Sequence, residues 1–366
     1  MRTGVAHLPL HTGKAPRWLF TLMVRLAREV LGHVVSEYGP EEVLRRLSDP
    51  FWFQAFGCLL GFDWHSSGVT TTTCGAIKEA VQGHEGDFGF VIAGGKGAAS
   101  RRTPQEITTA SEIWGKDPDR LVYASRMVAK VDSAAVQDGY QLYHHVFLFT
   151  QSGLWSVIQQ GMSDKSRMAR RYHWLSEQVT NLVIEPHAAV CCDVQGPTLN
   201  LVATESRPAQ TAMVELARTP DRDTNTLFDQ LPTLTLPDRH DLRTEDLDTR
   251  YVKKILLKTY EEKPQDFEQL LGVPGVGPKT LRALALAAEL IYGTPASTHD
   301  PARFAFAHGG KDRIPYPVDR TTYEQTIDVL HQAVNRANVE RSEKIRALKR
   351  LAMFIPPAAA SQLSST

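Results

Sequence analysis

The stretch 267–293, FEQLLGVPGVGPKTLRALALAAELIYG, constrains the fold and the partner of this chain more than any other. A Gly-x-Gly turn, Gly275 to Gly277, separates two segments whose apolar residues recur every three or four positions, as on one face of a helix. Pro278 suits the first turn of a helix, where no backbone donor is needed. Because the glycines keep the turn free of side chains, a phosphate can approach the amide groups at the helix N-terminus. The stretch therefore predicts two helices joined by an anion-binding turn.

Lys279 adds a positive charge, and Thr280 a hydroxyl, at the same end of the second helix. The whole stretch resembles the helix-hairpin-helix element, a sequence-independent DNA-backbone binder of glycosylases, nucleases, polymerases and recombination proteins. We therefore expect Gly275, Gly277, Lys279 and Thr280 to contact DNA. The alternative is a helical corner with a glycine turn and no ligand.

The composition is typical of a soluble globular protein, and it gives the chain no net positive charge that would attract nucleic acid. The 366 residues are long enough for two or three cores, and 42% of them are hydrophobic. The 41 basic and 41 acidic residues cancel, so any attraction for DNA must come from local patches. There is neither an apolar run of membrane-spanning length nor the apolar core of a signal peptide at the N-terminus. The 4 cysteines lack CxxC spacing, which excludes disulfide and zinc-cluster frameworks and predicts a cytoplasmic protein.

The periodicity along the chain predicts an α+β fold in which an N-terminal helical layer accompanies a small, mainly antiparallel sheet. Helices are predicted over 17–38, 41–47, 51–60 and 76–82, and a helix beginning at Pro104. Strands are predicted over 88–93, 140–149 and 154–161, with two further candidates at 182–194 and 199–204. The basic stretch that contains Lys165, Arg167, Arg170 and Arg171 is interpreted as a helix, and another helix is expected over 208–218.

Two domains are expected. Residues 1–220 would form the catalytic domain, and 221–245, rich in Pro, Asp, Thr and Arg, the linker. An all-α domain over 246–354 would hold the hairpin and two final helices, 321–337 and 342–353. Residues 355–366 are predicted to be a disordered tail.

A polar loop, GFDWHSSGV, spans 61–69 between predicted helices. Asp63 and His65 are two residues apart, and such a carboxylate and imidazole can share a metal ion or a proton. The alternative is a loop held by the side-chain capping bonds that Asp and Ser commonly make.

A glycine-rich basic segment, GGKGAASRRTP, follows the first predicted strand and precedes a helix. Strand, glycine loop and helix together are typical of a phosphate cradle, although the spacing of a nucleotide-binding P-loop is absent. We expect Lys96, Arg101 and Arg102 to contact nucleic-acid phosphate. The alternative is a flexible basic turn.

Carboxylate, imidazole and other polar side chains that could take part in catalysis are most concentrated between residues 124 and 174. In a strand, His144 and His145 point to opposite faces, so the pair cannot chelate one ion. At most one of them joins a site with Asp132, Asp138 or Gln160. Polar residues among apolar strand neighbours need hydrogen-bond partners. Clustered carboxylates and histidines favour an active site over a purely structural polar network.

Several blocks that span nearly the whole chain resemble an uncharacterised archaeal and bacterial family, domain of unknown function seven-six-three. These blocks are RTGVAHLPLH, DPFWFQAFGCLLGFDWHSSGVTTT, GGKGAASRRTP, AKVDSAAVQDGYQLYHH, QQGM, ARRYHWLS and DPARFAFAHGGKDRIPYPVDR. The resemblance tilts the expected activity toward a DNA nuclease. It also implies that the signature blocks contain Asp63, His65, Lys130, Asp132, Asp138, His144 and His145, without assigning roles to them.

The preferred hypothesis is metal-dependent hydrolysis of DNA phosphodiesters in repair or processing. This chemistry needs ligands for Mg²⁺ or Mn²⁺, a base or metal-bound hydroxide, and a cation near the developing charge. Asp63, Asp132 and Asp138 are the predicted metal ligands. His144 or His145 is the candidate base or ligand, His65 belongs to the same group, and Lys130 and Lys96 would stabilise charge.

Two alternatives stay open. A helix-hairpin-helix glycosylase would use Lys279 as a Schiff-base nucleophile and Asp300 as its carboxylate, although such enzymes place that Asp a few residues earlier. A non-enzymatic DNA-binding protein would make the polar cluster structural. The expected partner is DNA, bound through its backbone without sequence preference. No membrane contact is expected, and a homodimer is left open.

Overall fold

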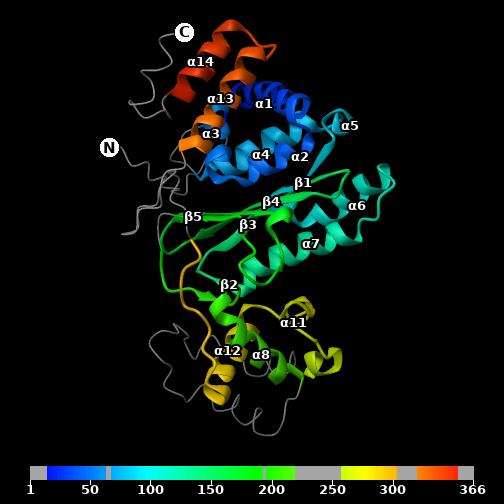
Figure 1. Ribbon diagram of the computed structural model, residues 1–366, viewed down its shortest axis with the longest axis vertical. Helices are drawn as coiled ribbons and strands as arrows, with labels where there is room; N and C mark the ends of the chain where they lie inside the picture. Colours follow the sequence, from blue (N-terminus) through cyan, green and yellow to red (C-terminus); the bar gives the residue numbers. More distant parts are fainter. Residues whose placement is uncertain (1–14, 63–66, 193–194, 219–256, 303–319, 353–366) are drawn as a thin grey trace.

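The fold is a three-layer arrangement in which helices cover both faces of one antiparallel sheet (Figure 1). The computed structural model describes residues 15–62, 67–192, 195–218, 257–302 and 320–352. It confirms the mixed α and β composition and the small antiparallel sheet predicted from the sequence.

The helical layer on one face is built from the N-terminal part of the chain. Its main helices are α1 (Arg17–Tyr38), α2 (Pro40–Ser48), α3 (Pro50–Leu60) and α4 (Gly68–Val81), followed by the short α5 (Glu85–Phe88). The bounds of α1 agree with the prediction. Its buried residues recur with helical periodicity, so one face of α1 packs into the core while the other faces solvent.

The five-stranded sheet has the order β1-β3-β4-β5-β6 and is antiparallel throughout. Its strands are β1 (Phe90–Lys96), β3 (Gln141–Thr150), β4 (Trp155–Ser163), β5 (Met168–Leu175) and β6 (Ala189–Cys191). A separate two-stranded pair joins β2 (Val136–Gln137) to β7 (Leu199–Asn200).

Alternation along the strands divides the apolar side chains between two cores. Val146 and Leu148 belong to the core shared with α1 to α4, whereas Phe147 and Phe149 belong to the core on the other face. The second core is covered by α6 (Thr103–Ile113), α7 (Asp119–Lys130), a π-helical turn (Val131–Ala135) and α8 (Arg207–Arg218).

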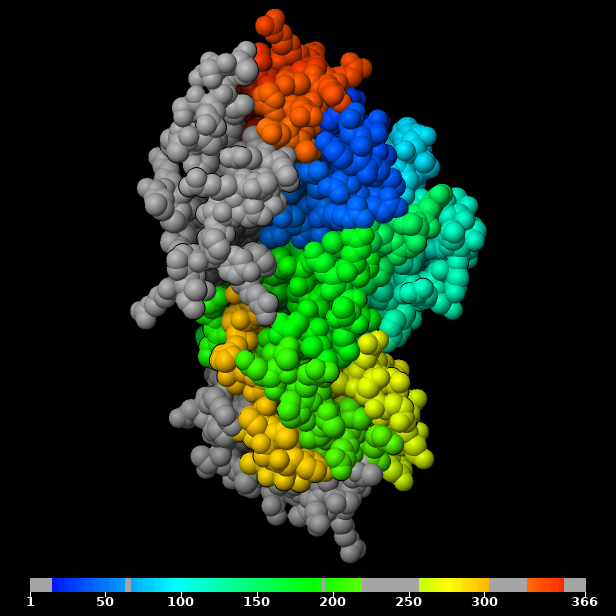
Figure 2. Space-filling view, viewed as in Figure 1, coloured from blue at the N-terminus to red at the C-terminus, as the bar shows by residue number. Residues whose placement is uncertain are grey.

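The helices expected in a single C-terminal domain pack into these two different cores. The hairpin helices α11 (Phe267–Gly272) and α12 (Pro278–Tyr292) pack against α8, whereas α13 (Arg320–Arg336) and α14 (Arg341–Ala352) pack against α1 and α3. The two pairs lie at opposite ends of the molecule (Figures 1 and 2). Arg350 reinforces the second contact by donating two hydrogen bonds, of 3.0 and 2.6 Å, to the Leu59 carbonyl. The linker predicted over 221–245 and the tail over 355–366 lie outside the described residues.

The basic stretch interpreted as a helix is instead a turn followed by strand β5, and that prediction was wrong. Lys165 and Arg167 are exposed in the turn, whereas Arg170 and Arg171 in the strand are only 1% and 0% exposed. Arg171 donates to His173 Nε2 (2.8 Å) and Gln54 Oε1 (3.1 Å), and burial lowers its pKa to about 10. Partners from other elements, which the local charge pattern does not reveal, hold this segment as a strand.

Three boundaries also differ from prediction. Helix α4 includes the four threonines that precede its predicted start, because Thr70 and Thr73 are buried in its packing face. Strand β1 runs through the glycines to Lys96 and is followed by a 3₁₀ helix, Gly97–Arg102, instead of an open loop. The strand candidates over 182–194 and 199–204 reduce to β6 and β7. Among the helices that the structure describes, none is long and apolar enough to cross a membrane.

Candidate functional site

Asp132 lies at the centre of a buried polar group beneath the sheet. It is 0% exposed and sits in the π-helical turn, a distortion that often marks functional positions. Its Oδ2 accepts hydrogen bonds from Gln159 Nε2 (2.5 Å) and Trp174 Nε1 (2.9 Å). Its Oδ1 lies 2.5 Å from His187 Nε2. Donors on two strands and one loop therefore converge on this single carboxylate.

The same group extends through Gln159 to His145 and Ser125. His145 Nδ1 lies 2.8 Å from Gln159 Oε1, and its Nε2 lies 2.9 Å from Ser125 Oγ. Because the Gln159 amide nitrogen donates to Asp132, its oxygen must accept from His145 Nδ1–H. The imidazole Nε2 then accepts from the Ser125 hydroxyl. Burial lowers the pKa of His145, which keeps the ring neutral in this hydrogen-bond chain.

Asp138 belongs to a second buried group with Arg170 and Asp300. Arg170 donates to Asp138 Oδ2 (2.9 Å) and to both oxygens of Asp300 (2.9 and 2.7 Å). Tyr172 donates its hydroxyl to Asp138 Oδ2 (2.6 Å), and the Tyr140 backbone N–H bonds to Oδ1 (3.0 Å). Burial raises the pKa of Asp138, whereas Arg170 and the Tyr172 hydrogen bond oppose that rise.

The predicted metal ligands do not form a joint metal site within the described residues. Both oxygens of Asp138 already accept hydrogen bonds, and the adjacent Arg170 charge disfavours a cation there. Asp132 is similarly engaged by three donors. No group of three or more His, Cys, Asp or Glu suited to a metal ion occurs in this part of the chain. Asp63 and His65 lie outside the described residues, so Mg²⁺ or Mn²⁺ stays a prediction.

His144 lies on the opposite face of the sheet from His145, as the strand alternation predicted. It shares its face with Val146, in the core with α1 to α4. His144 is 1% exposed, and neither of its ring nitrogens has a hydrogen-bond partner among the described residues. Burial, together with the charges of His145 and Lys96, lowers its pKa to about 3.

In the glycine-rich segment, the Glu106 carboxylate occupies the position where a phosphate was expected. Glu106 Oε2 accepts from the Gly94 backbone N–H (2.8 Å) and from Lys78 Nζ (2.5 Å), in the position expected for a phosphate. Gly94 has a φ of +92°, and a Cβ there would lie 2.3 Å from the His145 carbonyl oxygen. Strand pairing therefore explains this glycine without a ligand.

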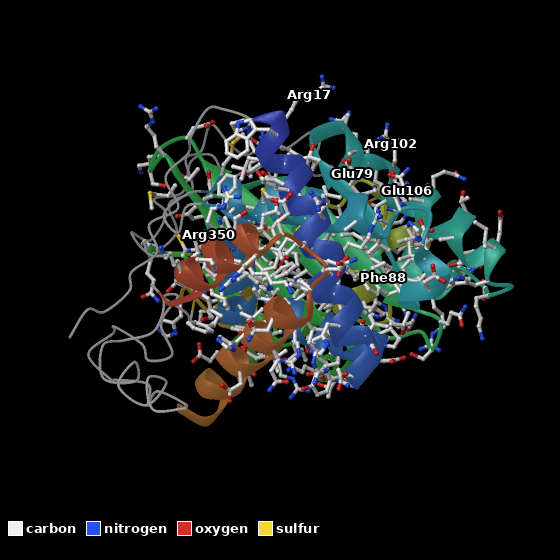
Figure 3. The ribbon with its side chains drawn as sticks, turned by 90° about the horizontal axis from the view of Figure 1, so that it is seen from above. Arg17, Glu79, Phe88, Arg102, Glu106 and Arg350 are labelled. Carbon is white, nitrogen blue, oxygen red and sulfur yellow. The ribbon has the colours of Figure 1, made fainter. Side chains whose placement is uncertain are left out.

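The basic side chains of the segment remain on the surface. Lys96, Arg101 and Arg102 are exposed. Arg102 Nε lies 3.7 Å from Glu106 Oε1, and Figure 3 shows the two residues near each other, well away from Arg350. Contact of these three cations with DNA stays a prediction.

The turn between α11 and α12 is exposed and carries little side-chain bulk. Gly275 has a φ of +99°, which favours glycine. Gly277 is the N-cap of α12 and offers no side-chain cap, and the first intrahelical bond runs from Leu281 N to the Gly277 carbonyl (3.0 Å). Lys279 is exposed beside it, whereas Thr280 is 0% exposed, so its hydroxyl points into the core and not toward a ligand on the surface.

Helix α7 and the segment after it hold this turn against the sheet layer. Lys130 Nζ donates to the Val273 carbonyl (3.2 Å), and Gln137 Nε2 donates to the Pro278 carbonyl (3.0 Å). Burial lowers the pKa of Lys130. The described geometry thus places Lys130 in the support of the hairpin, separate from the hydrogen bonds around Asp132.

Several residues of the buried groups were not singled out from the sequence. Gln159, Trp174 and His187 all hydrogen-bond to Asp132, and Gln159 also hydrogen-bonds to His145. His187 had one signal, its place within the strand candidate 182–194. Gln159 and Trp174 lie in the blocks QQGM and ARRYHWLS, but nothing local marks them as partners of Asp132, which they contact only in the folded chain.

The fold and its polar groups define an α+β protein with a central antiparallel sheet, two buried carboxylate networks and an exposed glycine turn. The chain belongs to the family described as "Protein of unknown function (DUF763)", whose model matches residues 4–318. Comparisons with curated proteins and with solved structures gave no match.

Proposed function

We propose that the protein binds DNA through the turn between α11 and α12 and hydrolyses phosphodiester bonds with Mg²⁺ or Mn²⁺. The observation that carries the binding part is the open N-terminus of α12. Gly277 supplies no cap, and a Cβ built on it meets only the Gly275 carbonyl oxygen, at 3.9 Å. A phosphate oxygen can therefore approach the first amides of α12, whose partial positive charge favours an anion.

The charge distribution supports contact with the backbone rather than with bases. The chain has a formal net charge of zero, so local contacts must supply the attraction. Lys279 provides one exposed cation next to the helix end. Contacts of this kind carry no sequence information and weaken as salt rises, because binding releases counterions from DNA.

The hydrolytic part is supported by the carboxylate and imidazole groups gathered around the sheet. Asp132 orients Gln159, which in turn fixes the tautomer of His145. A divalent metal would supply an activated water and neutralise charge on the phosphate.

The contacts of Asp300 argue against the glycosylase alternative. Its Oδ2 accepts from Arg170 (2.7 Å) and from the Gly196 backbone N–H (3.0 Å), and its Oδ1 accepts from the Ala302 backbone N–H (2.9 Å). A carboxylate so fully engaged, with Arg170 1% exposed beside it, is not poised to act with an exposed Lys279.

A valine at the turn tests the binding part directly. Gly277 has φ −142° and ψ −171°, extended backbone that valine adopts readily, so the fold should survive. The Gly277→Val protein should lose most of its DNA affinity at low salt because its side chain obstructs the phosphate. Gly86→Val in α5 is a matched control, since Gly86 also has open space around its Cβ position. Equal affinity of the two folded variants and the wild type would contradict the proposal.

A further inference from the structure

Helix α7 lies beside α11, the helix that leads into the exposed turn (Figure 1). The Tyr123 hydroxyl donates to Glu268 Oε1 (2.5 Å) in the first turn of α11. Seven residues later, Lys130 Nζ donates to the Val273 carbonyl (3.2 Å), just after α11 ends. The two helices therefore run in the same direction, and the C-terminal end of α7 lies beside the turn.

Arg126 lies on the face of α7 that carries these two contacts. It is three residues after Tyr123 and four residues before Lys130, the spacings that place side chains on one side of a helix. Arg126 is exposed, and it makes no hydrogen bond or ion pair within the described part of the chain. Its guanidinium is thus available, near the turn, to a partner outside this chain.

Lys130 is a cation that has lost part of its hydration without gaining a carboxylate partner. Its side chain is partly buried, and among the described residues its ammonium contacts only the Val273 carbonyl. Burial lowers the pKa of Lys130, which means that the charged form is destabilised there. Because an ammonium has three N–H donors, two remain for an anion. A phosphate at the turn would supply the missing negative charge.

The charges of α7 and the residues just before it are unevenly distributed. At the N-terminal end, the exposed Asp117 and Asp119 outnumber Arg120, whereas the C-terminal half presents Arg126 and Lys130. A polyanion at the turn is therefore attracted to the C-terminal half of α7 and repelled by the other end. Four residues of helix rise about 6 Å, so the two cations can contact different phosphates.

We infer that duplex DNA bound at the turn continues over the C-terminal half of α7, where Arg126 and Lys130 contact its phosphates. The inference rests on the proposed function, because the turn must hold the DNA first. It adds a second contact on a different helix. One contact leaves a duplex free to rotate about the turn, whereas two contacts fix the direction in which it crosses the protein.

Binding titrations at several salt concentrations test the second contact. Arg126→Met removes the charge and keeps a good helix former, so the fold should survive. The slope of log affinity against log salt should fall by about one, and by about two when Lys279→Ala is added. Arg17→Met is the matched control, since Arg17 is exposed on α1, at the other end of the molecule (Figure 1), and it should keep the wild-type slope.

A photocrosslinker attached to an introduced cysteine gives a second readout. The four native cysteines are buried, so a thiol reagent should label Arg126→Cys selectively in the folded protein. The labelled protein should crosslink to duplex DNA, and the crosslink should disappear when Gly277→Val is added. Labelled Arg17→Cys should give no crosslink.

Two results would overturn the inference alone, provided that Gly277→Val weakens DNA binding. One is a wild-type salt slope in Arg126→Met or an equal fall in Arg17→Met, since any surface cation would then act alike. The other is absence of a crosslink from Arg126→Cys. If the unmutated protein does not bind duplex DNA at low salt, the DNA-binding proposal itself fails, and the second contact fails with it.

Discussion

Asp300 and Arg170 form a two-point ion pair, with Oδ1 and Oδ2 of the carboxylate 2.9 and 2.7 Å from the two terminal guanidinium nitrogens. Their side chains are 7% and 1% exposed. This pair ties the segment after α12 to strand β5, while Gln137 ties the first residue of α12 to the other side of the same layer. Helix α12 is thus anchored near both ends, and the exposed turn is held in a fixed position relative to the sheet.

Removal of this anchor should destabilise the protein. Asp300→Ala leaves the buried Arg170 charge with Asp138 as its remaining carboxylate, and we expect a loss of about 3 kcal/mol in the free energy of unfolding. Urea denaturation measures the change. Glu205→Ala is the control, because that carboxylate is 65% exposed and its contacts with His299 and with the Ser297 hydroxyl (2.9 Å) should contribute little. Similar stability of the two variants would show that Asp300 is not an anchor.

The charge of Lys279 should act on DNA and not on the fold. Lys279 is exposed, so Lys279→Ala should leave the unfolding midpoint unchanged. The slope of log affinity against log salt should fall by about one, since one phosphate contact is lost. Binding titrations at several salt concentrations measure this slope. Lys116→Ala, at an exposed lysine after α6, should keep the wild-type slope, and an identical slope in both variants would remove Lys279 from the interface.

The sequence predicted those elements that are determined by residues close together in the chain. Apolar periodicity after a proline predicted helix α1, and glycines followed by a proline predicted the turn around Gly275. The opposite orientation of His144 and His145 follows from strand alternation alone.

The elements that depend on distant partners were predicted less well. From the sequence alone, Arg170 is expected on the surface. In the structure it is buried, because it pairs with Asp138, which precedes β3, and with Asp300, which follows α12. Similarly, Glu106 fills the supposed phosphate position at Gly94 from the following helix. Gln160 was a candidate site residue in the sequence, but its position directly opposite His144 follows only from the pairing of β4 with β3.

Acid should destabilise the fold through His173. Burial, with the Arg171 charge next, lowers its pKa well below 6.5, whereas the hydrogen bond to the Leu47 carbonyl opposes that shift. The ring is therefore a neutral imidazole, which accepts from Arg171 through Nε2 and donates to Leu47 through Nδ1. The unfolded chain binds a proton near pH 6.5 and the folded chain does not, so stability is lost as pH falls below that value.

Well below the pKa of His173 in the unfolded chain, this residue should lower the free energy of unfolding by about 1.4 kcal/mol for each pH unit of acidification. His173→Gln keeps a donor and an acceptor but does not titrate. Unfolding free energies measured at several pH values should therefore depend less steeply on pH in this variant, by about that amount. Parallel curves for variant and wild type would contradict a buried neutral His173.

Cleavage of intact DNA is the most direct measurement of the proposed function. Purified protein should cut undamaged strands with Mn²⁺ or Mg²⁺, leaving ordinary phosphate and hydroxyl ends, and chelator should abolish the reaction. Lys279→Ala should bind DNA more weakly but retain metal-dependent cleavage. The contradictory result is release of a free base in chelator, with Lys279 trapped on the product by borohydride, since that chemistry belongs to a glycosylase and needs no metal.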